Sequence, residues 1–185
     1  RQCLDLWQAL GHDVQVAKSF RWLSRLHWFI GKRKEADRYA EDALDLGEEY
    51  RQSDEYAMAC SNRSQLYMLS GDVERAREWA SRAIDLAEAN DDTDTLVHAL
   101  NNLGTALDHR SLSEGMPHLL RSLELSLENN RQEHVARAYT NIASNLVSSK
   151  RYGDARQYLD AGIDYTAERD LDSWLYYMQG WRARL

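Results

Sequence analysis

The sequence predicts an all-α fold, a solenoid of antiparallel helical hairpins stacked on one another. Three observations lead to this prediction: small residues recur at a fixed interval, apolar residues follow helical spacing, and only one proline occurs in 185 residues. No long stretch alternates apolar and polar residues as a strand would. Since each hairpin of a solenoid buries its apolar face on its neighbours, we expect a repeating unit of about 40 residues along the chain.

The recurring small residues mark the second helix of each predicted hairpin. The four anchors, Ala36, Ala76, Gly115 and Ala155, lie 40, 39 and 40 residues apart, and the residues seven positions after them are Ala43, Ala83, Ser122 and Gly162. Small side chains two turns apart on one face allow two helices to approach closely. The spacing therefore predicts four hairpins in a common register.

The first helix of each hairpin also carries a small residue in the same register, eleven or twelve residues before the anchor. These residues are Ser24, Ser64, Gly104 and Ala143. Short turns with glycine or small polar residues separate the two helices of each hairpin. The third turn is irregular, because Pro117 falls one turn into the second helix, where it either delays the start of that helix or kinks it. We expect a hinge there.

The register divides the chain into six segments. They are a trailing helix of a preceding repeat (1–12), four repeats (17–52, 57–91, 97–130 and 136–170) and the first helix of a fifth repeat (172–185). Solenoids normally end in polar capping units, whereas Trp174, Leu175 and Trp181 make the last segment apolar. We therefore expect the chain to be a piece of a longer array.

The motif Leu103-Gly104 with Leu107, and Ala76 with Ala83-Ile84, resemble the consensus of the tetratricopeptide repeat. This resemblance implies a right-handed superhelix whose concave face is lined by the first helices and binds a protein or peptide. The repeats run about six residues beyond the family's usual length, and the family's proline after the second helix is missing.

Several short segments of the sequence resemble the sensor arrays of large LuxR-type (MalT-like) bacterial transcriptional regulators. They are the segments 20–28, 98–105, 138–141 and 168–174. Such a resemblance implies a cytoplasmic protein whose ATP-binding module precedes the array and whose DNA-binding domain follows it. This segment carries neither a phosphate-binding loop nor a basic recognition helix.

Composition argues against several other functions. The formal net charge of −7 repels nucleic-acid phosphates, and no apolar run approaches the 18 or so residues that cross a bilayer. Neither His-x-x-x-His nor Cys-x-x-Cys spacing occurs, so we expect no metal site, no cofactor and no catalysis. Cys60 takes an apolar position, which disfavours a disulfide with Cys3.

Asparagines recur on the first helices at one register position. Asn62, Asn102 and Asn141 each stand two residues before the small residue of their helix. A carboxamide offers both a donor and an acceptor, which suits the backbone of an extended peptide. The sequence therefore predicts a ladder of ligand-binding amides, although the same amides could instead bond within their own repeats.

The first repeat replaces this ladder by a cationic and aromatic patch at Arg21, Trp22, Arg25 and Trp28, and Arg137 adds positive charge to the predicted groove. Guanidinium groups beside indole rings suit a carboxylate, a peptide terminus or an aromatic ligand. The alternative is that these aromatic residues pack on a preceding helix.

Two functions are compatible with these features. One is a non-catalytic sensor module whose groove binds a peptide, partner protein or small effector and changes its curvature. The alternative is a free-standing adaptor that assembles a protein complex. Self-association through the edge repeats is a third and weaker interpretation. Neither membrane contact nor direct nucleic-acid contact is expected of this segment.

Overall fold

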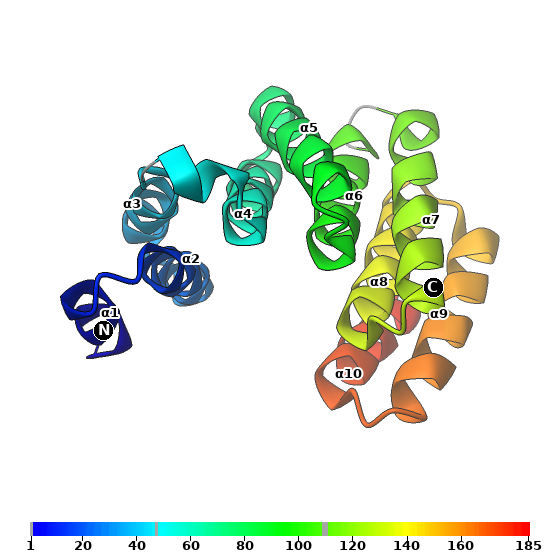
Figure 1. The fold of residues 1–185 in the computed structure, drawn as a ribbon. Helices are drawn as coiled ribbons and strands as arrows, with labels where there is room; N and C mark the ends of the chain where they lie inside the picture. The colour runs from blue at the N-terminus through cyan, green and yellow to red at the C-terminus, as the bar shows by residue number, and fades with distance from the viewer. Residues whose placement is uncertain (1, 47, 109–110) are drawn as a thin grey trace. The chain divides into compact units, whose positions relative to one another are not determined.

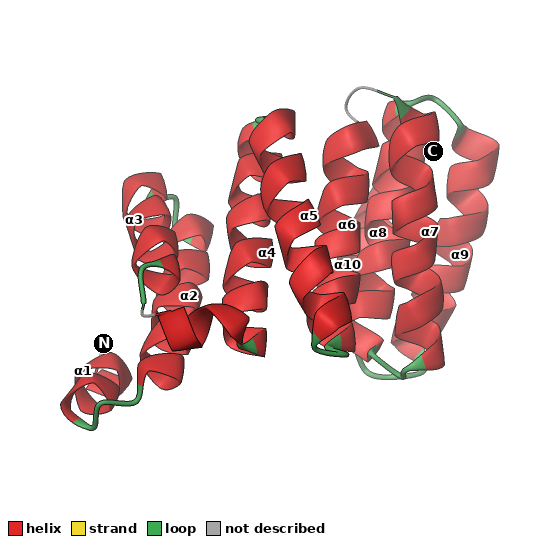
Figure 2. Ribbon diagram, turned by 45° about the horizontal axis from the view of Figure 1, so that its top comes forward, coloured by secondary structure: helices red, strands yellow, loops and turns green. Residues whose placement is uncertain are grey.

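The computed structural model describes residues 2–46, 48–108 and 111–185, and every regular element within these ranges is a helix. The elements in chain order are α1 (Gln2–Ala9), α2 (Asp13–Phe29), α3 (Arg33–Leu44), the 3₁₀ helix η1 (Glu48–Gln52), α4 (Asp54–Ser70), α5 (Val73–Ala89), α6 (Thr93–Asp108), α7 (Leu112–Glu128), α8 (Gln132–Ser148), α9 (Tyr152–Ala167) and α10 (Asp172–Arg182). Figure 2 shows them joined by short loops. The predicted all-helical hairpin fold is confirmed.

The helices pack as consecutive pairs within two compact units, residues 1–95 and 96–185. In the first unit α2 pairs with α3 and α4 with α5, and α4 also contacts both helices of the preceding hairpin. In the second unit α7 contacts α8, α8 contacts α9, and α10 packs on both α8 and α9 (Figure 1). None of the described helices is long and apolar enough to cross a membrane.

Local signals at the helix ends explain why the chain turns where it does. The Ser53 hydroxyl accepts from the Tyr56 backbone N–H (3.2 Å), and the Asp72 carboxylate accepts from that of Arg75 (3.1 Å), so both residues cap helix N-termini. Between α4 and α5, Gly71 adopts a left-handed conformation with φ 80°. Later turns use non-glycine residues with positive φ, namely Asp91, Asn130, Lys150 and Asp170.

The predicted small residues lie where helices approach most closely. A Cβ atom on Gly104 would come within 2.7 Å of the Leu119 side chain and 2.8 Å of the Gly115 carbonyl. A Cβ atom on Gly162 would lie 2.6 Å from the Met178 sulfur. The anchor Ala155 is fully buried, like Ala76 in the first unit. These positions accept no larger side chain without a shift of the helices.

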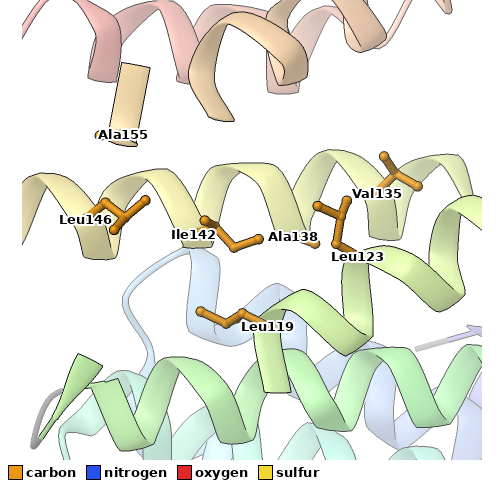
Figure 3. Packing of buried hydrophobic residues seen from close by; sticks show 7 residues of the cluster. All are labelled: Leu119, Leu123, Val135, Ala138, Ile142, Leu146 and Ala155. Atoms are coloured by element: carbon orange, nitrogen blue, oxygen red, sulfur yellow. The ribbon is translucent and has the colours of Figure 1, made fainter. Parts of the chain in front are cut away.

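The second unit has a leucine-rich core between α7, α8 and α9. Figure 3 shows seven of its buried side chains, which are Leu119, Leu123, Val135, Ala138, Ile142, Leu146 and Ala155. In the first unit the buried face of α5 consists of alanines, at Ala76, Ala80, Ala83 and Ala87. Both patterns follow the helical period predicted from the sequence.

Two expectations about helix bounds need correction. Helix α7 begins at Leu112 and runs through Pro117, so the proline does not delay its start. The first turn of a helix has no intrahelical acceptors for its N–H groups, and a proline just beyond it removes only one such bond. Helices α2, α4, α6 and α8 begin three or four residues before the repeat bounds drawn from the sequence.

Candidate functional site

In the first unit, Asn62 lies buried between α4 and α2. Its Nδ2 donates to the Ser24 hydroxyl at 3.2 Å, and only 2% of the residue is exposed. Its Oδ1 is buried and has no hydrogen-bond partner among the described residues. The amide nitrogen of Asn62 therefore links two neighbouring repeats, while its oxygen is an acceptor without a described donor.

Arg21 is committed to a buried ion pair. Its Nε and Nη2 donate to the two carboxylate oxygens of Glu55 at 2.5 and 3.3 Å, and the two side chains are 8% and 12% exposed. Such a bidentate pair between α2 and α4 fixes the spacing of the first two hairpins. Arg21 thus serves packing in this structure, a role that the sequence did not reveal because Glu55 is 34 residues away.

Trp22 and Arg25 form the exposed part of the predicted cationic and aromatic patch. The Arg25 guanidinium lies 5.2 Å from the Trp22 ring centroid and that of Arg21 lies 5.4 Å from it. Trp22 is 47% exposed, and Arg25 makes no ion pair with a described residue. Burial lowers the pKa of Arg25, and the charge of Arg21 lowers it further. An anionic partner would offset this repulsion, and an aromatic partner could stack on the guanidinium.

Trp28 belongs to a different surface. It lies edge-on to Phe29, with ring centroids 5.4 Å apart, and lines a small cavity with residues of α3 and α4. Because it stands six positions after Trp22 on the same helix, the two indoles lie on different faces. The structure therefore divides the predicted patch of four residues into an ion pair, a stacked pair and a cavity wall.

In the second unit, Asn102 and Arg137 are bonded to each other. Arg137 Nη2 donates to Asn102 Oδ1 at 2.5 Å, and Asn102 Nδ2 lies 3.4 Å from His98 Nδ1. Asn102 and Arg137 are buried, with 0% and 8% exposure. These contacts join α6 to α8 through side chains that the sequence assigned to a ligand groove.

Asn141 is partly buried and bonds to a residue that the sequence analysis had not singled out. Its Nδ2 donates to Asn101 Oδ1 at 2.5 Å, while Nδ2 of Asn101 is buried with no partner among the described residues. The signal was present, since Asn101 stands exactly one forty-residue period before Asn141. Asn145, one turn further along α8, also has a buried Nδ2 without such a partner.

Each unit contains side-chain amide atoms without a hydrogen-bond partner among the described residues. They are the Nδ2 donors of Asn101 and Asn145 in the second unit and the Oδ1 acceptor of Asn62 in the first. A backbone N–H or carbonyl group could satisfy an atom of either kind. No group of His, Cys, Asp and Glu side chains in the described part of the chain could hold a metal ion. The cysteines are both free, Cys3 exposed and Cys60 buried. Burial raises the pKa of the Cys60 thiol to about 12, which keeps it unreactive.

Residues 57–90 match the family model of the tetratricopeptide repeat. This range covers all but the first three residues of α4 and the whole of α5, so the chain contains a repeat of this kind. A comparison with curated proteins by sequence found no match.

Solved structures with the same fold come from proteins of several kinds. Aspartyl phosphate phosphatase F from Bacillus subtilis matches with a TM-score of 0.75 and 18% identity, over 92% of this chain and 45% of that one. A Rap protein complexed with Competence and Sporulation Factor matches with a TM-score of 0.71 and 15% identity, over 85% and 44%. A putative kinesin light chain from Podospora anserina has a TM-score of 0.60 at 14% identity, over 91% and 84%. This chain thus spans under half the length of the first two proteins.

Proposed function

We propose that this chain is a binding module that holds a peptide or a segment of a partner protein along the first helices of its hairpins. The observation that carries the proposal is Asn145 on α8, which is partly exposed and whose Nδ2 has no hydrogen-bond partner among the described residues. An unmade bond of this kind costs about 1–3 kcal/mol. A carbonyl group of an extended peptide backbone would supply the missing acceptor, whereas Asn62 and Asn101 are only 2% and 1% exposed and serve contacts within the chain.

The comparisons support a binding role. A Rap protein of the same fold was solved with Competence and Sporulation Factor bound, and the tetratricopeptide repeat matched at residues 57–90 is typically an interaction module without catalysis. We propose accordingly that the chain acts by binding and that any reaction of its structural neighbours is their own. Trp22 and Arg25 would add a subsite for an acidic or aromatic side chain of the ligand.

Selection of short displayed peptides on the whole chain, followed by fluorescence anisotropy with a selected peptide, tests the groove. Asn145→Ala should weaken binding about tenfold, because it removes a partly exposed amide worth about 1 kcal/mol or more at the ligand. Asn129→Ala is the matched control, since its exposed amide only donates to the Leu125 carbonyl at the end of α7.

Thermal unfolding without peptide separates binding from packing. We expect Asn145→Ala to change the melting temperature little, because Asn145 is partly exposed and its Nδ2 bonds to no described residue. Asn102→Ala should lower the melting temperature, because the buried Arg137 loses this acceptor. Equal affinity in all variants, or a loss of affinity that only follows the loss of stability, would contradict the proposed groove.

The regulator context is a finer proposal that rests on the sequence resemblance alone. We propose that the array is the sensor of a LuxR-type regulator, with a free-standing adaptor as the alternative. A phosphate-binding loop encoded upstream and a helix-turn-helix encoded downstream would support the regulator. A stable protein partner without any stabilisation by peptide would favour the adaptor.

A further inference from the structure

A small cavity whose lining includes none of the asparagines opens between the first two hairpins. It has a volume of about 100 Å³ and lies between the end of α2, the start of α3 and the end of α4. The buried residues Ala36 and Leu66 line it together with the aromatic side chains of Trp28 and Tyr67. An apolar cavity of about 150 Å³ accepts a benzene ring, so this smaller one has room for an aliphatic side chain such as leucine and not for a phenylalanine ring.

Exposed apolar residues line the cavity or directly follow its lining residues along the chain. Leu69 lines it and is 40% exposed, and Phe29 and Ile30, which directly follow Trp28, are 70% and 65% exposed. Single exposed apolar residues are common on protein surfaces, whereas several beside one cavity mark an interaction site. The apolar rim therefore indicates a hydrophobic anchor on the ligand.

The turn before α3, beside the cavity, is positively charged within an acidic chain. Lys32, Arg33 and Lys34 are consecutive and exposed, Arg33 lines the cavity, and none of the three forms an ion pair with a described residue. Asp37 also lines the cavity, but its carboxylate is bonded to Arg63 at 2.9 Å, which leaves the Arg33 charge available. Such a basic turn attracts carboxylates and repels cations.

We propose that this cavity docks a segment of a partner protein that presents one bulky apolar side chain flanked by acidic residues. The apolar side chain enters between Trp28 and Tyr67, and the carboxylates meet the basic turn at Arg33. A walled cavity of this size favours a side chain over a membrane surface, which needs a broad apolar face. None of the groove asparagines lines this cavity, so binding at the two places can be tested separately.

The test uses the whole chain and a fluorescein-labelled peptide, acetyl-Asp-Glu-Leu-Asp-Glu-amide. We expect saturable binding in fluorescence anisotropy and amide NMR shifts at Arg33, Ala36 and Leu69. Replacing the leucine of the peptide by alanine, or its four acids by amides, should weaken binding about tenfold each. The asparagine variants of the groove should leave this binding unchanged.

Protein variants have matched controls in the second unit. Arg33→Glu and Leu69→Asn should each weaken binding about tenfold. Arg156→Glu makes the same change of net charge on the exposed face of α9, and Leu127→Asn alters a leucine of equal exposure (41%), so both should bind normally. Equal losses in test and control variants would overturn the proposal.

Other occupants of the cavity give distinct results. Binding to vesicles of phosphatidylserine and phosphatidylcholine, without binding of the peptide, would assign the surface to lipid and overturn the proposal. Light scattering that shows a dimer, abolished by Arg33→Glu, would assign it to a second copy of this chain with the same effect. Absence of peptide binding at millimolar concentration would also refute it.

Discussion

At the scale of single residues, arginines on first helices play several roles that their sequence contexts do not distinguish. Arg21 lies in a buried ion pair, whereas Arg25, one turn later, stacks on Trp22 and has no ion pair with a described residue. Arg63 donates to Asp37, Glu41 and Tyr67 at 2.9–3.1 Å, and so ties α4 to the preceding α3. Packing and ligand recognition thus use the same side-chain type within a few residues.

We predict that Arg21→Ala lowers the free energy of unfolding by about 3–5 kcal/mol, because it leaves the largely buried Glu55 carboxylate without its partner. Urea denaturation followed by circular dichroism measures this loss. Arg156→Ala, at an exposed site on α9, should change stability by less than about 0.5 kcal/mol. An effect of Arg21→Ala no greater than this control would mean that the pair is solvated and contributes little.

At the scale of helices, close approach depends on a few positions without large side chains. Glycine inside a helix is normally less stable than alanine, so its presence at Gly104, Gly115 and Gly162 needs a reason. The contacts of Gly162 with Met178 on α10 and Tyr139 on α8 provide one, since a Cβ atom there would overlap with both.

Two glycines of α9 allow a matched prediction. Gly162→Ala should destabilise the chain by about 1–3 kcal/mol through overpacking. Gly153→Ala should instead stabilise it by up to about 1 kcal/mol, because nothing lies within 4 Å of the added Cβ atom and alanine has the higher helix propensity. Thermal and urea unfolding of both variants check the prediction, and shifts of the same sign would contradict it.

The hairpin register was predictable because it depends on steric demands within one repeat. Small residues at Ala76, Gly104 and Ala155 are required wherever two helices touch, so their spacing is visible in the sequence. Helix starts were placed late, because caps such as Ser53 were not used to set the bounds. The pairing of Asn141 with Asn101 could not be predicted from one register alone, since it depends on the rotation of α6 against α8.

The sequence predicts which types of residue lie at the candidate site better than it predicts what each of them contacts. Whether Asn62 or Asn102 faces a ligand or a neighbouring helix depends on the rotation of whole helices, which no local pattern encodes. From the sequence alone, Trp28 could either contact a ligand or pack on a preceding helix. Its cavity needs α3 and α4 as well, and therefore became visible only in the structure.

At the scale of the whole molecule, the chain consists of two compact units that each contain their own buried residues. The first relies on alanine seams and buried polar contacts such as the Arg21–Glu55 pair, and the second on a leucine-rich core. In repeat proteins the stability is close to a sum of local terms between neighbours. Damage to one unit should therefore remain largely local.

Hydrogen exchange followed by mass spectrometry can test this locality. Arg21→Ala should speed amide exchange in α2 and α4 while leaving α8 and α9 nearly unchanged. Gly162→Ala should show the reverse distribution, with faster exchange in α8, α9 and α10. A uniform increase through all helices in both variants would show instead that the chain opens as one cooperative body.

The buried alanines of α5 affect how such a chain can lengthen during evolution. Ala76 and Ala83 are buried, the Ser64 hydroxyl donates to the Ala76 carbonyl at 2.8 Å, and the hairpin α4–α5 carries its own caps at Ser53 and Asp72. A duplicated copy of residues 53–92 would therefore bring along both its turn signals and its contact surfaces. Gene duplication can extend the array by whole hairpins, and the number of docking positions can evolve without compensating substitutions elsewhere.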